Sequence, residues 1–364
     1  MRRFTLAAIV CLPLALSYGL LRPAVAAPPS AAQLPQNAKW MIHIDLQALV
    51  QTELAEAARA ERPRLTHLMQ RWFQAKFGIN PHEDLDSLTL FSDSYDEHQG
   101  TMILRADYAM DKVRDAFDQN PDVTKEAWEG YTLYTIEPER RSRLRPAEDN
   151  GDARRRLLPR RQDNDNTAAN RDEVLEAPSE RAMTVILVND KSMVIASSPE
   201  RAKKAVGLVR GDSPILAEDS PLLAEVEEGA LLYGAAIDLQ QIEHRAGFFP
   251  VLAQHERIYW TIGGSDGELN VKLVLHAHTE DVAEQMEKAL EGSIAFGKVW
   301  AADSENLRQV FDNRQLSREG KRVQLTGHAE METVRAVIGE LRERLQQRLQ
   351  LGNEGAAGRR ADSR

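Results

Sequence analysis

The sequence predicts an α+β protein of two related halves, each with antiparallel strands and hairpins and with helices packed on one face. Two observations support this fold class. The tetrapeptide Ile-Asp-Leu-Gln occurs at 44–47 and again at 237–240, each time at the end of an apolar run. The same order of patterns surrounds both copies: an alternating strand, a helical segment, a hairpin and an amphipathic helix. This shared order indicates an internal duplication.

Residues 1–26 have the features of a secretory signal peptide. Arg2 and Arg3 precede a mostly apolar stretch at 6–21, and Ala-Val-Ala at 24–26 matches a cleavage site. The apolar stretch is short for a membrane span, and an uncleaved N-terminal anchor is the alternative. We therefore expect an exported protein, periplasmic or extracellular, with no transmembrane segment after cleavage.

Composition excludes several chemistries. Cys11, the single cysteine, lies inside the predicted signal, so the mature chain would contain no thiolate for zinc, iron–sulfur clusters or nucleophilic catalysis. Cleavage would also remove three arginines, which lowers Lys plus Arg from 46 to 43 against 56 Asp plus Glu, a net charge of −13. Such a charge predicts a soluble protein that does not bind nucleic acid.

The first half is expected over 37–212, after a Pro/Ala-rich linker at 27–36. Alternation of apolar and polar residues predicts strands, and apolar residues at helical spacing predict helices. In chain order, we expect a strand at 39–45, helices at 46–60 and 65–77, strands at 87–91 and 101–106, a helix with Met110, Val113 and Phe117 on one face, and a strand at 131–136.

A charged insertion interrupts this half at 138–181. Residues 140–161 contain nine arginines, whereas residues 162–180 contain six acidic residues. The composition predicts a disordered segment whose opposite charges screen each other. The alternative is an arginine-rich patch that binds an anionic polymer.

The first half then closes with strands at 183–188 and 192–196 and a helix. Ser198 is the expected N-cap of that helix, Pro199 its first residue, and Gly211 its end.

The second half is expected over 228–350, followed by a flexible tail at 351–364. Its predicted elements are a strand at 231–237, a helix at 239–252, a hairpin of 257–262 with 269–277, a helix capped by Thr279 with Val282, Met286 and Leu290 on one face, a helix at 303–311, a hairpin turning at 319–320, and a last helix carrying Val334, Ile338, Leu341 and Leu345.

Asp45 and Asp238 each stand where a strand passes into a predicted helix. A carboxylate there can accept the free N–H groups of the first helical turn, so helix capping is the expected role of both. The alternative is a catalytic pair of carboxylates, one from each half.

His276 and His278 are the candidate metal ligands. Side chains two residues apart on a strand share one face, which suits metal binding if a third ligand lies nearby. The other interpretation is a solvated strand end.

Three further patterns have structural explanations. Residues 263–267 match the G-x-S-x-G motif of serine hydrolases, but an alternating strand follows where a helix would be required, so a hairpin turn is expected. The loop from His82 to Asp86 is acidic without calcium-binding spacing, and we interpret it as a solvated, helix-capping loop. His43 and Asp45 share a strand face and could form a hydrogen-bonded pair.

The opening from Leu34 to Asp45, LPQNAKWMIHID, resembles the start of exported planctomycete-like bacterial domains of unknown function, which begin with LP-x-x-A and a strand ending in Asp. The resemblance implies export and an α+β fold. No catalytic residue can be carried over from it.

The resulting expectation is a non-enzymatic binding or scaffolding protein of the envelope, without a cofactor, whose partner is an envelope protein or polymer. The alternative is a metal-assisted envelope hydrolase that uses His276 and His278.

Overall fold

The fold is taken from a computed structural model, which describes residues 29–53, 55, 56, 59, 63–96, 99–136, 182–242, 254–265, 267–341 and 343. The predicted signal peptide, the charged insertion and the C-terminal tail lie outside these residues.

The strands are β1 (Trp40–Asp45), β2 (Leu85–Ser92), β3 (Thr101–Ala106), β4 (Val123–Trp128), β5 (Tyr131–Ile136), β6 (Met183–Asn189), β7 (Ser192–Ala196), β8 (Ala230–Ile237), β9 (His255–Ser265), β10 (Glu268–Ala277), β11 (Arg314–Glu319) and β12 (Arg322–Glu330). The labelled α-helices are α2 (Leu46–Val50), α4 (Pro63–Phe77), α5 (Met110–Asp118), α6 (Pro199–Arg210), α7 (Glu280–Trp300) and α8 (Glu305–Asp312), and the 3-10 helices are η1 (Ala31–Gln33), η2 (Pro221–Leu223) and η3 (Leu239–Ile242). Residues 331–341 are also helical, where the last helix was expected.

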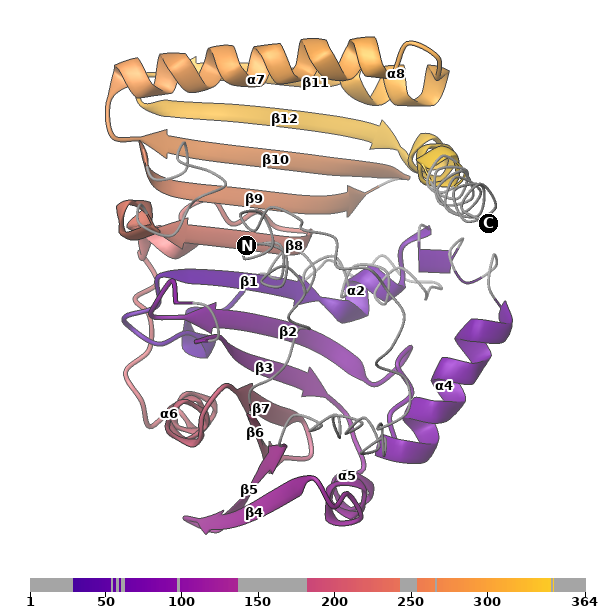
Figure 1. The fold of residues 1–364 in the computed structure, drawn as a ribbon, viewed down its shortest axis with the longest axis vertical. Coiled ribbons are helices and arrows are strands. Elements are labelled where there is room, and N and C mark those ends of the chain that lie inside the picture. The colour runs from indigo at the N-terminus through magenta and orange to yellow at the C-terminus, as the bar shows by residue number, and fades with distance from the viewer. Residues whose placement is uncertain are drawn as a thin grey trace, which may run out of the picture.

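All these strands belong to one antiparallel sheet (Figure 1), in the order β11-β12-β10-β9-β8-β1-β2-β3-β7-β6-β5-β4. The expected α+β class is confirmed. The two halves of the chain are not separate layers, because β1 of the first half pairs directly with β8 of the second.

The repeated tetrapeptide lies at the two ends of this central ladder. In the antiparallel register, Trp40 is opposite Ala236 and Ile44 is opposite Leu232. Asp45 therefore lies where β1 ends, and Asp238 follows the end of β8, at the opposite end of this strand pair. Seven residues of strand separate them, on the order of 20 Å. This separation excludes a shared pocket for the two carboxylates.

The chain leaves the centre in the same way on both sides. In the first half, β2 and β3 are followed by α5 and then by a meander of β4 to β7, whose last strand pairs with β3. In the second half, β9 and β10 are followed by α7 and α8 and then by β11 and β12, and β12 pairs with β10. The first meander has two strands more than the second. The sequence analysis did not anticipate β4, whose residues are mostly exposed and lack alternation.

Helices lie on both faces of the sheet. Val194 of β7 packs in the same cluster as α6, whereas its neighbours Met193 and Ile195 pack with α5. Because successive strand residues point to opposite faces, α6 and α5 are on opposite sides. Val274 of β10 packs in the α6-face cluster, whereas the strand residues on either side of it pack with α7. Helix α7 therefore lies on the α5 face. The expected packing on one face thus holds for α5 and α7 and not for α6.

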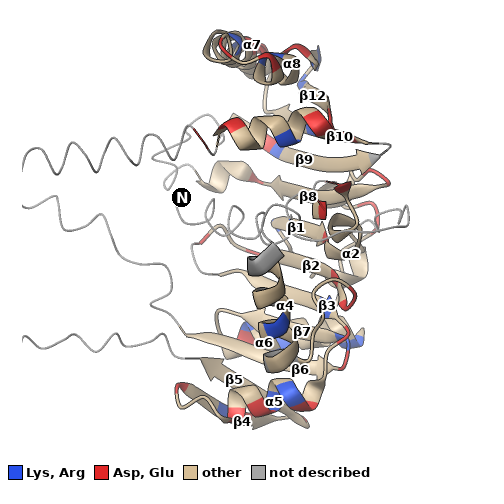
Figure 2. Ribbon diagram, turned by 90° about the vertical axis from the view of Figure 1, so that its right-hand side faces the viewer, with Lys and Arg blue, Asp and Glu red and all other residues tan. Residues whose placement is uncertain are grey.

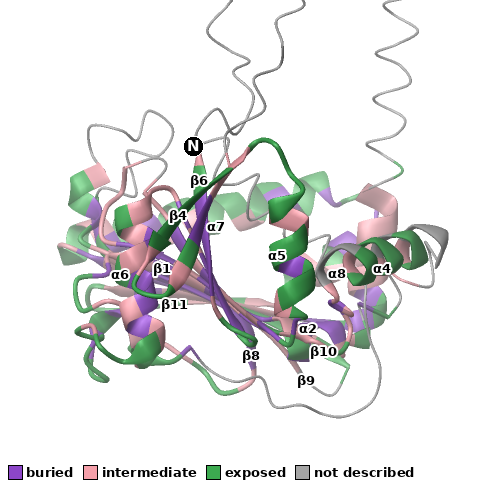
Figure 3. Ribbon diagram, turned by 90° about the horizontal axis from the view of Figure 1, so that it is seen from below, coloured by how far each residue is buried: buried purple, intermediate pink, exposed green. Residues whose placement is uncertain are grey.

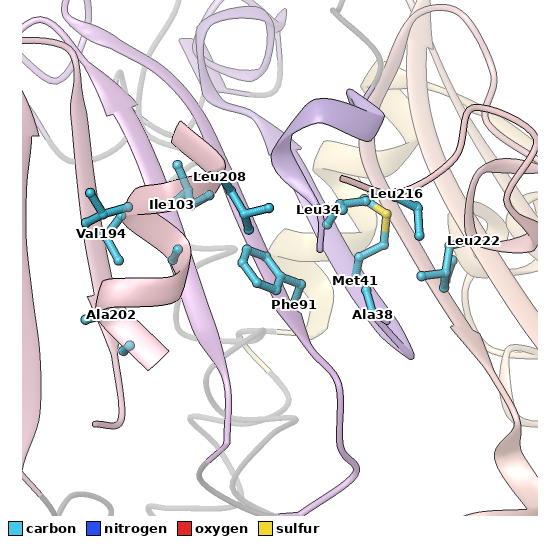
Figure 4. Packing of buried hydrophobic residues seen from close by; sticks show 14 of the residues in the cluster. Leu34, Ala38, Met41, Phe91, Ile103, Val194, Ala202, Leu208, Leu216 and Leu222 are labelled. Atoms are coloured by element: carbon cyan, nitrogen blue, oxygen red, sulfur yellow. The ribbon is translucent and has the colours of Figure 1, made fainter. Parts of the chain in front are cut away.

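Buried residues follow the central strands (Figure 3), and many of the Lys, Arg, Asp and Glu residues lie on helices and loops (Figure 2). The largest apolar cluster lies on the α6 face. Figure 4 shows it extending from Val194 and Ala202 through Phe91 to Met41 and Leu222.

At most of these helix starts, the N-cap side chain accepts a main-chain N–H of the first turn, as expected. Oδ1 of Asp45 accepts the N–H of Ala48 at 2.7 Å. The side chains of Ser198, Thr279 and Ser304 accept the N–H groups of Arg201, Val282 and Leu307 at the starts of α6, α7 and α8. Gly211 ends α6 with a φ of 79°, in the left-handed region that favours glycine.

Asp238 differs from its counterpart. Its φ is 57°, whereas an N-cap residue is normally extended, and the 3-10 helix η3 follows it instead of the α-helix expected at 239–252. The bond that starts η3 runs from the N–H of Gln241 to the main-chain carbonyl of Asp238, at 3.1 Å. The rest of the expected helix, from 243 to 252, lies outside the described residues.

Candidate functional site

A pocket of about 370 Å³ lies on the α6 face, beside the central cluster. One wall is the segment before β1, from Pro35 to Asn37. The floor is formed by the end of β2 and the start of β3, and the opposite wall is α6 with the loop at 213–214. The volume lies within the range of small-molecule sites.

The segment before β1 is fixed by hydrogen bonds at both ends of the turn that it makes. The N–H of Leu216 donates to the carbonyl of Leu34 at 2.8 Å, and the N–H of Gln36 donates to the carbonyl of Pro214 at 3.3 Å. Just upstream, the buried hydroxyl of Thr89 donates to Oε1 of Gln33 at 2.8 Å. The pocket wall is therefore pre-formed.

Thr89 also contacts His43, whose Nδ1 lies 2.9 Å from its Oγ1. His43 and Asp45 thus each have a hydrogen bond with another residue, Thr89 for His43 and the main chain of Ala48 for Asp45. Both side chains are buried, and these bonds place His43 in a structural chain that anchors η1 to the sheet.

An ion pair crosses one end of the pocket. Nη2 of Arg201, on α6, donates to Oδ1 of Asp93 at 2.8 Å and also to Oε1 of Gln99. Nδ2 of Asn37 donates to the other oxygen of Asp93 at 3.4 Å. Burial alone would raise the pKa of Asp93, but the hydrogen bond and the charge of Arg201 outweigh it, and the pKa is lowered. Asp93 therefore stays ionised.

Lys204 supplies a second cation one helical turn further along α6. Within the described part of the chain, no carboxylate lies within salt-bridge distance of its ammonium group, whereas its neighbour Lys203 contacts Glu126 at 3.0 Å on the other side of the helix. With Arg201 and Lys204 against Asp93, the pocket has a net charge of +1.

Apolar side chains make up the body of the pocket. Phe91, Ala205 and Leu208 are buried, and Pro35 and Pro214 also line the pocket. Figure 4 shows Leu208 of α6 next to Phe91 of β2. This arrangement, an apolar body with a few fixed polar groups, is the usual form of a small-molecule site.

A second hollow, of about 420 Å³, lies on the same sheet face over β9, β10 and β12. Its lining is polar, and an ion-pair network adjoins it. Glu225 binds Arg322 through both oxygens at 3.1 Å and contacts Lys272 at 3.0 Å. The network ties the loop after η2 to the strands, which gives it a structural role.

The candidate metal ligands are not brought together into a metal site. His276 packs edge-on against Tyr259 and lies 3.8 Å from Glu225. Burial, together with the positive charges of Arg257 and Arg322, lowers the pKa of His276. Those same cations repel a metal ion.

His278 follows the end of β10, beyond a register shift after His276. The extra residue of this shift is Glu256 on β9, and β10 itself ends at Ala277, so no strand geometry fixes the ring of His278 on the face of His276. Among the residues that the structure describes, no three His, Cys, Asp or Glu side chains are grouped closely enough to hold a metal ion. The geometry thus gives the metal-hydrolase hypothesis no support.

The G-x-S-x-G motif lies in a hairpin. β9 runs to Ser265 and β10 begins at Glu268, with Gly267 at a φ of 80° between them. The serine does not stand between a strand and a helix, as a nucleophile elbow requires.

The acidic loop after α4 closes on itself. Oδ2 of Asp84 accepts the N–H of Asn80 at 2.5 Å, and Oδ1 of Asn80 accepts the N–H of His82 at 3.3 Å. The carboxylate of Asp84 thus serves the loop backbone.

His82 predicts a pH dependence of stability. Burial and the charge of Arg59 lower its pKa from 6.5 to about 4. Between these values the unfolded chain binds a proton that the folded chain does not, so the free energy of unfolding falls as the pH drops from 6.5 to 4. The full shift corresponds to about 3 kcal/mol. Because the ring is partly exposed, screening reduces the expected loss to about 1 kcal/mol.

Urea denaturation at pH 7 and pH 4.5 measures this effect. His82→Gln is expected to remove that part of the pH dependence, with His328→Gln as the control, because His328 is exposed on β12 and is not among the groups that shift the pKa of His82. An unchanged pH profile in the His82 variant would contradict the assignment.

No local sequence pattern predicts the pocket. Its residues come from the segment before β1, from β2, β3 and α6, and from the loop after α6, with no common motif, and only the pairing of β2 with β3 and the docking of α6 bring them together. The arginine-rich block at 140–161 lies outside the described residues. None of the described helices is long and apolar enough to cross a membrane.

Comparison with known proteins gives little further information. No protein-family model and no curated protein matches the chain. Among solved structures, crystal forms III, I and IV of TP0453 are similar, with TM-scores of 0.45, 0.40 and 0.40 and sequence identities of 11%, 13% and 10%. They cover 86%, 88% and 86% of this chain and 99%, 99% and 97% of TP0453. Similarity at this level says nothing about function.

Proposed function

We propose that the protein is an exported, non-enzymatic binding protein of the cell envelope, and that its ligand site is the pocket between α6 and the segment before β1. The observation that carries the proposal is the pocket itself: about 370 Å³ with mostly apolar walls, a pre-formed frame and a few fixed polar groups. The proposal of export is supported by the signal-peptide features of residues 1–26.

The lining residues favour binding over catalysis. The one carboxylate, Asp93, is held by Arg201 and Asn37, so it is not available as a general base. The hydroxyl of Ser213 is directed to the main-chain carbonyl of Lys204, at 3.5 Å. Neither a histidine nor a cysteine is among the described lining residues. A nucleophile with an adjacent base, which covalent catalysis requires, is therefore missing from this described lining.

The test uses N-phenyl-1-naphthylamine, an uncharged fluorescent probe with an apolar aromatic body. Gln36 is exposed at the pocket mouth, and its side chain lines the pocket. Gln36→Trp is expected to fill the mouth and to weaken binding of the probe at least tenfold in a fluorescence titration. Gln36→Ala, which keeps the same backbone bonds and fills nothing, is expected to bind as the wild type does.

Probe binding that is equal in the wild type and in Gln36→Trp would place the probe elsewhere and would reject the pocket as the ligand site. Circular dichroism of both variants checks that the fold is intact.

A further inference from the structure

We infer that the pocket selects amphiphilic anions, small molecules with an apolar body and one negatively charged group, and that Lys204 is the residue that recognises the charge. This inference rests on the proposed function and names the class of ligand for the same site.

The two cations of the pocket differ in whether they are already paired with a carboxylate. Arg201 is held by two acceptors, Asp93 at 2.8 Å and Gln99, so its charge is largely neutralised where it stands. Lys204 lines the same pocket and, within the described residues, pairs with no carboxylate. The positive charge left over in the pocket therefore belongs to Lys204. An anion that enters meets this charge without breaking an existing ion pair.

The position of Lys204 on the helix places it over the apolar body of the pocket. Lys204, Ala205 and Leu208 lie within about one turn of α6, and all three line the pocket. Residues three and four apart on a helix are neighbours on its surface, so the ammonium group and Leu208 are on the same side. A ligand whose apolar part contacts Leu208 and Phe91 can therefore place its charged group beside Lys204.

Asp93 adds discrimination against other charges. Its carboxylate stays ionised at the same rim, because Arg201 and the charge of Lys204 lower its pKa against the effect of burial. A ligand with two separated negative groups would bring one of them towards this carboxylate, and like charges at close range repel. A single anionic group at the Lys204 side avoids the repulsion.

The matched probe for this inference is 1-anilinonaphthalene-8-sulfonate, which has the same aromatic body as N-phenyl-1-naphthylamine and one added sulfonate. We expect the wild type to bind the sulfonate probe more tightly than the neutral probe, and the preference to shrink as ionic strength rises. Lys204→Gln is expected to weaken the sulfonate probe about tenfold and to leave the neutral probe unchanged. Laurate is expected to displace the sulfonate probe at lower concentrations than dodecanol does.

Lys203→Gln is the control variant, because Lys203 has the same charge on the adjacent helix position but faces Glu126 and Trp128. It should leave both probes unchanged. If Gln36→Trp removes both probes while Lys204→Gln leaves the sulfonate probe at wild-type affinity, the anion inference is wrong and the pocket remains the site. If Gln36→Trp affects neither probe, both the inference and the proposed function fail.

Discussion

Gly234→Val is expected to lower the free energy of unfolding by about 3 kcal/mol, because it overpacks the junction between the two halves. Gly234 lies on β8, opposite Ile42 of β1 and Trp260 of β9. A Cβ at this position would lie 2.1 Å from the indole of Trp260, a distance that no rotation of the new side chain relieves. The indole itself packs in the cluster with Ile42 and Ile44, so it has little room to move.

Chemical denaturation measures this loss, and a double-mutant cycle identifies its cause. In a Trp260→Ala background, Gly234→Val should cost at least 1 kcal/mol less, since the clashing ring is absent. Gly292→Ala on α7 is the control glycine, with no atom within 4 Å of its Cβ position, and it should raise stability by up to about 1 kcal/mol. Additive costs in the cycle would show that the clash with Trp260 is not the reason.

Glu225→Gln is expected to cost about 2 to 3 kcal/mol at pH 7. The variant loses the two-point bond with Arg322 and the contact with Lys272, and it leaves these two cations beside His276 without their shared carboxylate. Breaking one partner of a buried ion pair costs 3–5 kcal/mol, and we expect less here because Glu225 is 16% exposed and Arg322 is 29% exposed.

The pH dependence gives an independent readout of Glu225. Burial would raise its pKa, but hydrogen bonds from Arg322 and Lys272 outweigh burial, and the pKa lies below 4.5. Its contribution is therefore present above pH 4.5 and is lost as the pH falls through the folded pKa. Glu225→Gln should lack this acid-induced loss. Glu227→Gln is the control, because the side chain of Glu227 is 49% exposed and, among the described residues, bonds to Lys272 alone, and it should cost less than 1 kcal/mol. Equal costs for the two variants would refute the central role of Glu225.

The sequence predicted the class of fold because most strands and helices have strong local signals. β3, β5 and β7 have the predicted bounds, and α6 begins and ends at its predicted cap residues because Ser198, Pro199 and Gly211 act locally. The weakly patterned β4 escaped prediction. The four repeated letters suggested equal helix starts, but Asp238 adopts a left-handed conformation and Asp45 does not.

The candidate site could not be predicted for a different reason. His276 and His278 have the spacing of metal ligands, yet β10 ends before His278, and the cations around His276 come from tertiary structure. Likewise, nothing in the local sequence distinguishes Lys204 from Lys203. Only the docking of α6 places one at the pocket and the other beside Glu126.

The pairing of β1 with β8 is the claim on which the shared sheet and the position of the pocket wall depend. Hydrogen exchange followed by mass spectrometry tests it directly, because β1 is bonded on both sides, to β2 and to β8. The account predicts that the amides of 40–45 and 230–237 exchange together and among the slowest of the chain. Fast exchange of 40–45 with slow exchange of 230–237, or the reverse, would contradict a single sheet.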